Sequence, residues 1–127
     1  MDNKNIFEFQ IGSFYEGFDR VFLKNQTLYH ETPSHPDEET NPVLIVEEVK
    51  LTDEQFNLFW DNLDKLKVWD WKKDYTNPGI MDGTEWRLKI NKPEKKHLKT
   101  EGQNAYPKNF NTFLKLINAH IKEELYK

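Results

Sequence analysis

The chain has 127 residues, the length of one domain, which is enough to bury a hydrophobic core without disulfides or metals. It has no cysteine, so disulfides, thiolate metal ligands and a thiol nucleophile are excluded. Its net charge of −4 provides no basic surface for nucleic acid, and no segment reaches the roughly 20 apolar residues of a membrane helix. We therefore expect a single soluble domain over residues 1–127 that binds neither nucleic acid nor membrane.

The start of the chain and its residue usage bear on location. Residues 1–5 are polar and lead directly into residues 6–9, without the apolar core of a signal peptide. Lysine far outnumbers arginine and asparagine is abundant, a usage typical of bacteria with AT-rich genomes. We therefore expect a bacterial protein that is cytoplasmic.

Three strands are predicted first. Residues 6–11 alternate apolar and polar side chains, which predicts a strand with one buried face. Residues 18–24 and 27–32 are strand-like and flank a polar turn, so we expect a hairpin there. The apolar side chains of the first strand share one face: Phe7, Phe9 and Ile11.

A loop and a fourth strand follow. Residues 33–42 contain three prolines and no large apolar side chain, so we expect an exposed loop. Residues 43–50 begin with the apolar run Val-Leu-Ile-Val, which predicts a central strand of the sheet. This strand is expected to reach solvent at Glu47 and Glu48.

The first helix has the clearest signals in the sequence. Thr52 and Gln55 have the spacing of a capping box, and Leu51 and Phe56 have the spacing of a hydrophobic staple. Apolar residues then recur at helical spacing, which predicts one buried stripe. The stripe consists of Phe56, Phe59, Trp60, Leu63 and Leu66.

The second half is predicted to contain a hairpin and a helix. Residues 68–83 contain several turn signals and are expected to be irregular. Residues 84–91 alternate, and a hairpin loop leads to a return strand over residues 97–101. Pro107 is expected to be the first residue of a second amphipathic helix that runs to about Glu124.

The expected order is thus four strands, a helix, two strands and a helix. Short connections favour antiparallel pairing, and two amphipathic helices can both bury their stripes against one face of a single sheet. We therefore predict an α+β fold with a mostly antiparallel sheet and both helices packed on one face.

The sequence lacks the motifs of catalysis and of cofactor binding. The four histidines form no ligand pair at useful spacing, and His35 lies in an acidic, proline-rich loop that would hold a metal poorly. His120 borders the apolar stripe of the second helix, where a boundary residue is more common than a general base. No nucleophile elbow, phosphate loop or dinucleotide fingerprint occurs. We expect no cofactor and no metal, and we favour a protein that is not an enzyme.

A local concentration of lysines surrounds the second hairpin. It consists of Lys89, Lys92, Lys95, Lys96 and Lys99. Lysines at a hairpin tip commonly protect a sheet edge, and we favour this role over a track for phosphates.

Residues 69–86 are the best candidate for a binding site. Aromatic and charged side chains alternate in this segment, a composition typical of binding hot spots. The alternative is that the rings belong to the core. We favour the core for Trp69 and Trp86, whereas the two alternatives are evenly balanced for Trp71 and Tyr75.

Residues 102–107 form a second candidate segment. Gly102 suits a positive φ and Asn104 can hydrogen-bond the backbone, so a structural role is favoured over ligand binding. We expect this turn to meet the first segment in space. The predicted binding residues are Trp69, Trp71, Tyr75, Asp82, Trp86, Asn104 and Tyr106.

The motifs of the second half resemble those of a family of small uncharacterised bacterial proteins, a domain of unknown function. Trp71 and Tyr75 precede Asp-Gly-Thr-Glu-Trp-Arg-Leu-Lys-Ile at 82–90, and Gly-Gln-Asn-Ala-Tyr-Pro at 102–107 precedes a phenylalanine. The similar patterns are DG-x-x-W-x-L-x-I and G-x-NAYP-x-x-F, within residues 52–121. The resemblance implies a shared fold and carries over no activity or catalytic residue.

Two functional hypotheses follow. We favour a non-enzymatic module that binds a protein partner, because the chain is acidic, lacks a catalytic constellation and carries the aromatic cluster at residues 69–86. Immunity proteins that neutralise bacterial toxins are one concrete version, by analogy. The alternative is a small-molecule-binding domain or a carboxylate-based hydrolase with a pocket between residues 69–83 and 102–106, where Asp82 and Asn104 supply polar groups. The sequence leaves the partner and the oligomeric state open.

Overall fold

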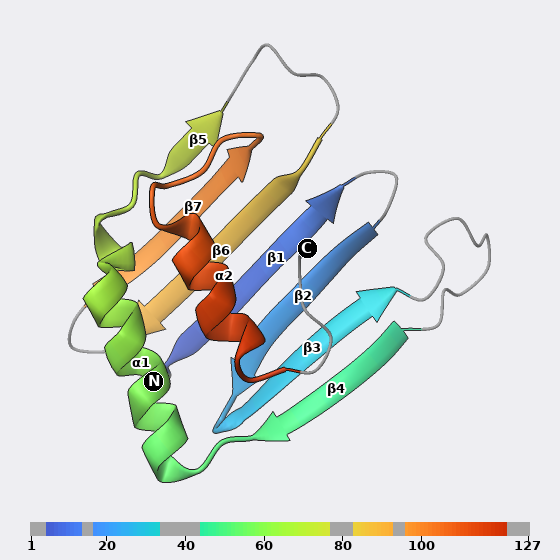
Figure 1. The fold of residues 1–127 in the computed structure, drawn as a ribbon, viewed down its shortest axis with the longest axis vertical. Coiled ribbons are helices and arrows are strands. Elements are labelled where there is room, and N and C mark those ends of the chain that lie inside the picture. Colours follow the sequence, from blue (N-terminus) through green and yellow to red (C-terminus); the bar gives the residue numbers. More distant parts are fainter. Residues whose placement is uncertain (1–4, 14–16, 34–43, 77–82, 93–95, 122–127) are drawn as a thin grey trace.

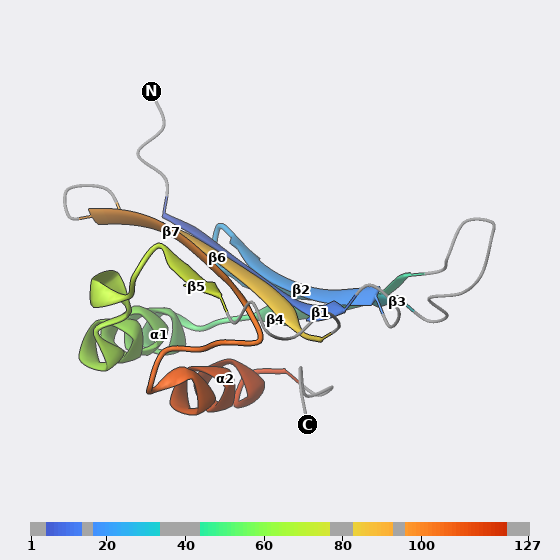
Figure 2. The ribbon, with the colours of Figure 1, turned by 90° about the horizontal axis from the view of Figure 1, so that it is seen from above.

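The computed structural model describes residues 5–13, 17–33, 44–76, 83–92 and 96–121. These residues form one seven-stranded sheet with the strand order β4-β3-β2-β1-β6-β7-β5. Both helices lie on one face of this sheet, and no element drawn in colour covers the other face (Figure 1 and Figure 2). The predicted α+β fold, with a mostly antiparallel sheet and two helices on one face, is therefore confirmed.

The first half of the sheet is an antiparallel meander. Its strands are β1 (Ile6–Ser13), β2 (Gly17–Lys24), β3 (Thr27–Pro33) and β4 (Leu44–Lys50). Each strand pairs with the next, and Asn25 takes a positive φ of 58° in the short turn between β2 and β3. The predicted hairpin is confirmed. The exposed loop predicted over residues 33–42 lies outside the described residues, apart from Pro33.

The position of β4 differs from the prediction. We expected a central strand, but β4 is at the edge of the sheet and has β3 as its neighbour. An apolar run needs only one covered face, so it fits an edge strand as well as a central one. Glu47 and Glu48 follow this run, and charged residues are characteristic of edge strands because they discourage pairing with another chain.

Helix α1 (Asp53–Leu66) begins at the predicted capping box. The Gln55 N–H donates to Thr52 Oγ1 over 3.1 Å, and the Thr52 N–H donates to Gln55 Oε1 over 2.9 Å. These bonds satisfy backbone donors that the first turn of a helix leaves unpaired. The helix ends at Lys67, which has a positive φ of 59°.

The second half contains two elements that the sequence did not predict. The short 3-10 helix η1 (Val68–Asp70) and strand β5 (Asp74–Thr76) lie within the segment expected to be irregular. Three residues are too few to show a period, and β5 depends on parallel pairing with residues 101–103. The predicted hairpin is present as β6 (Glu85–Lys92) and β7 (Lys96–Gln103), and β6 joins the two halves by pairing with β1.

Helix α2 (Phe110–Asn118) is shorter than predicted. We expected it to begin at Pro107, but the Phe110 N–H donates to the Pro107 carbonyl in a turn that precedes the helix. Asn109 occupies the N-cap position, but its side chain contacts Leu66 of α1 and Trp71, which follows η1, instead of capping the helix. The helix ends at Asn118, and the described residues 119–121 are not helical, so the predicted end near Glu124 was wrong.

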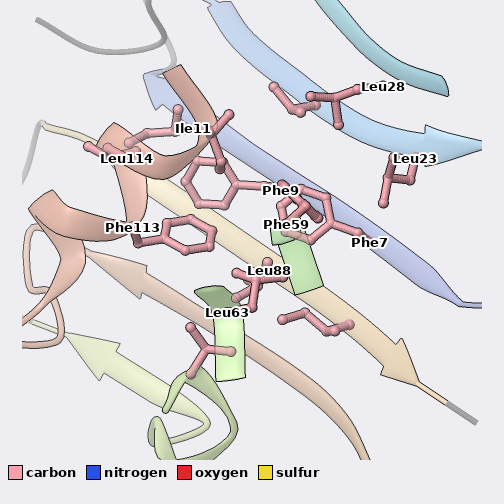
Figure 3. Packing of buried hydrophobic residues seen from close by; sticks show 14 of the residues in the cluster. Phe7, Phe9, Ile11, Leu23, Leu28, Phe59, Leu63, Leu88, Phe113 and Leu114 are labelled. Carbon is pink, nitrogen blue, oxygen red and sulfur yellow. The ribbon is translucent and has the colours of Figure 1, made fainter. Parts of the chain in front are cut away.

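The hydrophobic core lies between the sheet and the two helices and is rich in aromatic rings. Phe7 of β1 meets Phe59 of α1 with ring centroids 5.0 Å apart, and Phe9 meets Phe113 of α2 at 4.9 Å. Figure 3 shows these rings between the helices and β1, with Leu88 of β6 beside them. Such rings bury large apolar areas, so this layer supplies most of the hydrophobic stabilisation.

Candidate functional site

Two of the predicted site residues are core residues. Trp86 is 1% exposed and Trp71 is 8% exposed, and their ring centroids lie 5.9 Å apart. The Trp71 Nε1–H donates to Asn109 Oδ1 and the Trp86 Nε1–H donates to the Ala105 carbonyl, each over 3.0 Å. Buried tryptophans usually find such a partner for their one polar atom. Trp71, for which core and binding surface were equally expected, therefore belongs to the core.

Trp69 and Tyr75 are half-buried beside this core. The Trp69 Nε1–H donates to Asp64 Oδ1 over 2.8 Å, which ties η1 to α1. The Tyr75 hydroxyl accepts from the Lys72 N–H over 2.9 Å, and its ring centroid lies 5.8 Å from that of Trp86. Both rings are thus engaged in internal contacts.

The two predicted segments meet, and their contact is a structural clamp. Asn104 has a φ of 55°, and its Oδ1 accepts from the Thr84 N–H over 3.0 Å. The Asn104 N–H donates to the Thr84 carbonyl over the same distance. Gly102 has no positive φ, so that expectation was wrong; a Cβ at this position would lie 2.4 Å from Trp86 Nε1. The glycine is required for close approach of the indole.

Tyr106 is the predicted residue that remains exposed. Its side chain is 40% exposed, and its ring packs against Phe110 with centroids 4.9 Å apart. Asp82 lies outside the described residues. The rings of Trp71, Trp86 and Phe110 pack together on the core side of the two segments. A hollow of about 240 Å³, lined by Asp74 and Gly102 among others, lies between the two segments, where the alternative hypothesis placed a small-molecule ligand.

The outer face of the sheet carries a hollow that sequence reasoning missed. It has a volume of about 380 Å³ and lies over β1, β2, β6 and β7. Its polar side chains alternate along the strands with those of the core, as Gln10 does with Phe9 and Arg87 with Trp86. The hollow is lined by the cations Arg20, Lys73, Arg87, Lys89 and Lys99 and by the carboxylates Glu8 and Glu101.

Strand register brings these residues together from distant parts of the chain. Arg20 lies opposite Gln10, Gln10 lies opposite Arg87, and Arg87 lies opposite Glu101. Both arginines of the chain therefore lie in one cross-strand row over four adjacent strands. No local motif signals this row, because its members are far apart in sequence.

The β2 side of the hollow is electrostatically compensated. The Arg20 guanidinium lies 3.2 Å from a carboxylate oxygen of Glu8 and 3.2 Å from one of Glu31. It also lies 4.3 Å from the ring centroid of Phe22, which stacks on Tyr29. The contacts on three strands hold this arginine in place.

The β7 side of the hollow carries positive charge that is compensated only in part. Lys89 lies opposite Glu8 of β1 on one side and opposite Lys99 of β7 on the other, and like charges in such a position destabilise a sheet. None of the ion pairs among the described residues includes Lys73, Lys89 or Lys99. We expected Lys89 to protect a sheet edge, but β6 is an interior strand. That interpretation is therefore wrong for Lys89.

Among the described histidines, His30 makes buried polar contacts. His30 is 2% exposed, with its Nε2 3.4 Å from Asp19 Oδ1 and its Nδ1 3.9 Å from Glu47 Oε1. In the described part of the chain, no group of histidine and acidic residues could hold a metal ion. Burial lowers the pKa of His120, whose ring packs edge-on against Phe59.

Comparisons with known proteins supply no function. No protein-family model matches the chain, and no curated protein matches it either. The resemblance of its motifs to a bacterial family therefore stays a prediction. Neither helix of the described residues is long and apolar enough to cross a membrane.

Proposed function

We propose that the protein is a non-enzymatic module that binds a protein partner through the open face of its sheet. The observation that carries this proposal is the hollow of about 380 Å³ on a face that no described element covers. An antiparallel sheet needs only one buried face, so this face is free to serve a second purpose. The same core that stabilises the fold holds the strands rigid beneath it.

The carboxylates of the hollow favour binding over catalysis. A general acid or base usually needs an apolar setting that shifts its pKa. The Glu8 side chain is 45% exposed and that of Glu101 is 62% exposed, and each lies beside an arginine. Such carboxylates suit the polar part of a binding surface.

The aromatic segment 69–86 is not the binding site that we propose, because its tryptophans pack against the core. Neutralisation of a bacterial toxin is one concrete version of the proposed function. It would require the face to cover a substantial area of its partner, about 800 Å² per partner in a standard interface. The rows of side chains on β2, β1, β6 and β7 provide a broad surface of this kind.

Photo-crosslinking in cells that produce the protein tests this proposal. A benzophenone amino acid would replace Gln10, which lines the hollow, or Asn57, which is exposed on α1. We expect a discrete adduct with one protein from position 10 and none from position 57. Equal adducts from both positions, or no adduct from position 10, would contradict the proposal.

The folding of both crosslinking variants needs a control. Gln10 and Asn57 lie outside the hydrophobic core, so each variant should unfold in urea at the wild-type midpoint. If a variant forms no adduct but unfolds at the wild-type midpoint, the missing adduct reports on binding and not on folding.

A further inference from the structure

We infer that the partner surface which docks on this face is acidic, with carboxylates that enter the hollow beside Lys73, Lys89 and Lys99. This inference rests on the proposed function and names the chemistry of the partner. It follows from the uneven distribution of charge over the face.

The positive charge of the face is concentrated at three lysines that form no ion pair among the described residues, although Lys89 also lies opposite Glu8 of β1. Five cations and two carboxylates line the hollow, although the whole chain has a net charge of −4. Arg20 forms ion pairs with Glu8 and Glu31. The exposed Lys73, Lys89 and Lys99 have no ion-pair partner among the described residues.

The placement of the lysines costs stability, and an acidic partner would offset that cost. Lys89 and Lys99 are directly opposite each other on β6 and β7, and the backbone of Lys73 joins the same edge by accepting from the Glu101 N–H. Carboxylates placed between these ammonium groups would turn repulsion into attraction. Complementary charge also accelerates encounter and selects the partner.

A protein carboxylate fits this face better than a nucleic acid does. Nucleic acid carries closely spaced phosphates along its whole length, and some of them would fall on Glu8, Glu31 or Glu101. Phe22 stacks on Tyr29 with centroids 5.1 Å apart and is covered by Arg20, so the Phe22 ring is already engaged and does not serve as a platform for bases. A protein surface can place acids opposite the lysines and donors opposite the glutamates.

Binding of a defined acidic probe to the full chain tests the inference. The probe is a fluorescein-labelled decamer of alternating glutamate and alanine, and its affinity is measured by fluorescence anisotropy at low salt. The key variant is Lys99→Glu, which places a carboxylate opposite Lys89. We expect it to weaken probe binding about five- to tenfold and to raise the midpoint of urea unfolding. If Lys99 had only a structural role, the substitution would lower the probe affinity and the midpoint of urea unfolding together.

Lys108→Glu is the matched control, because it makes the same change in net charge at an exposed position near α2. We expect the control to leave probe affinity within about twofold of the wild type. Equal losses in the two variants would show a bulk charge effect and would overturn the inference. Tighter binding of an oligo-dT of equal length, or of inorganic phosphate, would overturn it in favour of those ligands. A dimer in analytical ultracentrifugation that Lys99→Glu dissociates would instead identify a second copy as the occupant.

The two proposals fail in different ways. An adduct from position 10 without binding of the acidic probe would retain the binding face and reject an acidic partner. Absence of both the adduct and probe binding would reject the proposed function together with the inference.

Discussion

The two faces of the sheet are built from the same strands but are held by different physics. On the inner face, Phe9 and Trp86 are about 1% exposed and pack against aromatic rings of α2. On the outer face, the next residues along the chain, Gln10 and Arg87, line a hollow. The inner face gains its free energy from apolar burial, whereas ion pairs on the outer face contribute little.

This difference separates stability from function along each strand. A change on the inner face should alter folding and leave the surface chemistry unchanged. A change on the outer face should alter the surface chemistry and have a much smaller effect on folding. Pairs of adjacent residues therefore provide matched tests of the assignment, because each pair differs mainly in the face to which it belongs.

Trp86 and Arg87 should give the largest contrast. We expect Trp86→Ala to lower the free energy of unfolding by about 3–5 kcal/mol, because it leaves a cavity and removes the donor to the Ala105 carbonyl. Arg87→Ala should change it by less than about 0.5 kcal/mol, since its side chain is 71% exposed. Urea unfolding measures both. Similar losses of unfolding free energy in the two variants would contradict the assignment of the two residues to different faces.

Gly102 and Gln103 test the same contrast at the end of β7. A Cβ at Gly102 would lie 2.4 Å from Trp86 Nε1, so Gly102→Ala should cost about 1–3 kcal/mol through overpacking. Gln103→Ala should cost less than about 0.5 kcal/mol, because Gln103 is exposed. Thermal and urea unfolding would measure the difference. A neutral Gly102→Ala would show that the indole shifts readily.

Two buried tryptophans differ in whether their indole nitrogen has a hydrogen-bond partner. Trp71→Phe removes the donor to Asn109 Oδ1 and should cost about 1–3 kcal/mol. Trp60 is also buried, but its Nε1 has no hydrogen-bond partner in the described part of the chain. Trp60→Phe should therefore cost about 1 kcal/mol less than Trp71→Phe, because it removes a buried donor that is unsatisfied. An equal cost in urea unfolding would contradict this reasoning.

Lys99→Glu should be one of the rare surface changes that stabilise the fold. It converts the Lys89–Lys99 pair into an opposite-charge pair, which should add about 0.2–1 kcal/mol to the free energy of unfolding. The gain should shrink in high salt, because exposed charges are screened. A gain of equal size in Lys108→Glu would show that net charge, and not the position on the sheet, is responsible.

The smallest effect should be a pH dependence from the inner face. Burial lowers the pKa of His120 below its ordinary value of 6.5, so the unfolded chain binds a proton more readily than the folded one. Stability should therefore fall as the pH drops below about 6.5, and His120→Asn should lose less between about pH 7 and pH 5. His97→Asn, on an exposed side chain of β7, is the control. Identical pH profiles of wild type and His120→Asn would refute the assignment.

The elements that could be predicted are those with local signals. The capping box at Thr52 and Gln55 marked the start of α1, and alternation marked the inner faces of β1 and β6. Strand β5 could not be predicted, because three residues carry no period and their pairing depends on β7. The edge position of β4 depends on the order of the strands in space, which no local pattern encodes.

The candidate site was harder to predict than the fold. Sequence reasoning identified the aromatic residues around Trp71 and Trp86, but large rings are as useful in a core as at an interface. It also identified Lys89 and Lys99, yet it assigned them to edge protection. Their actual neighbours, such as Arg20 and Gln10, come from strands whose register had to be known first.

The central position of β1 has a consequence for synthesis on the ribosome. This strand leaves the ribosome before β6, with which one of its two edges pairs, so Ile11 cannot pair with Trp86 until β6 has emerged. At about 5–20 residues per second, that delay lasts roughly 4–15 seconds. During this delay, the edge of β1 that later pairs with β6 is open in the β1–β4 meander, and Phe7 and Phe9 are exposed beside it. The nascent chain is therefore most vulnerable to aggregation before its second hairpin emerges, and a chaperone that covers this edge would act in that interval.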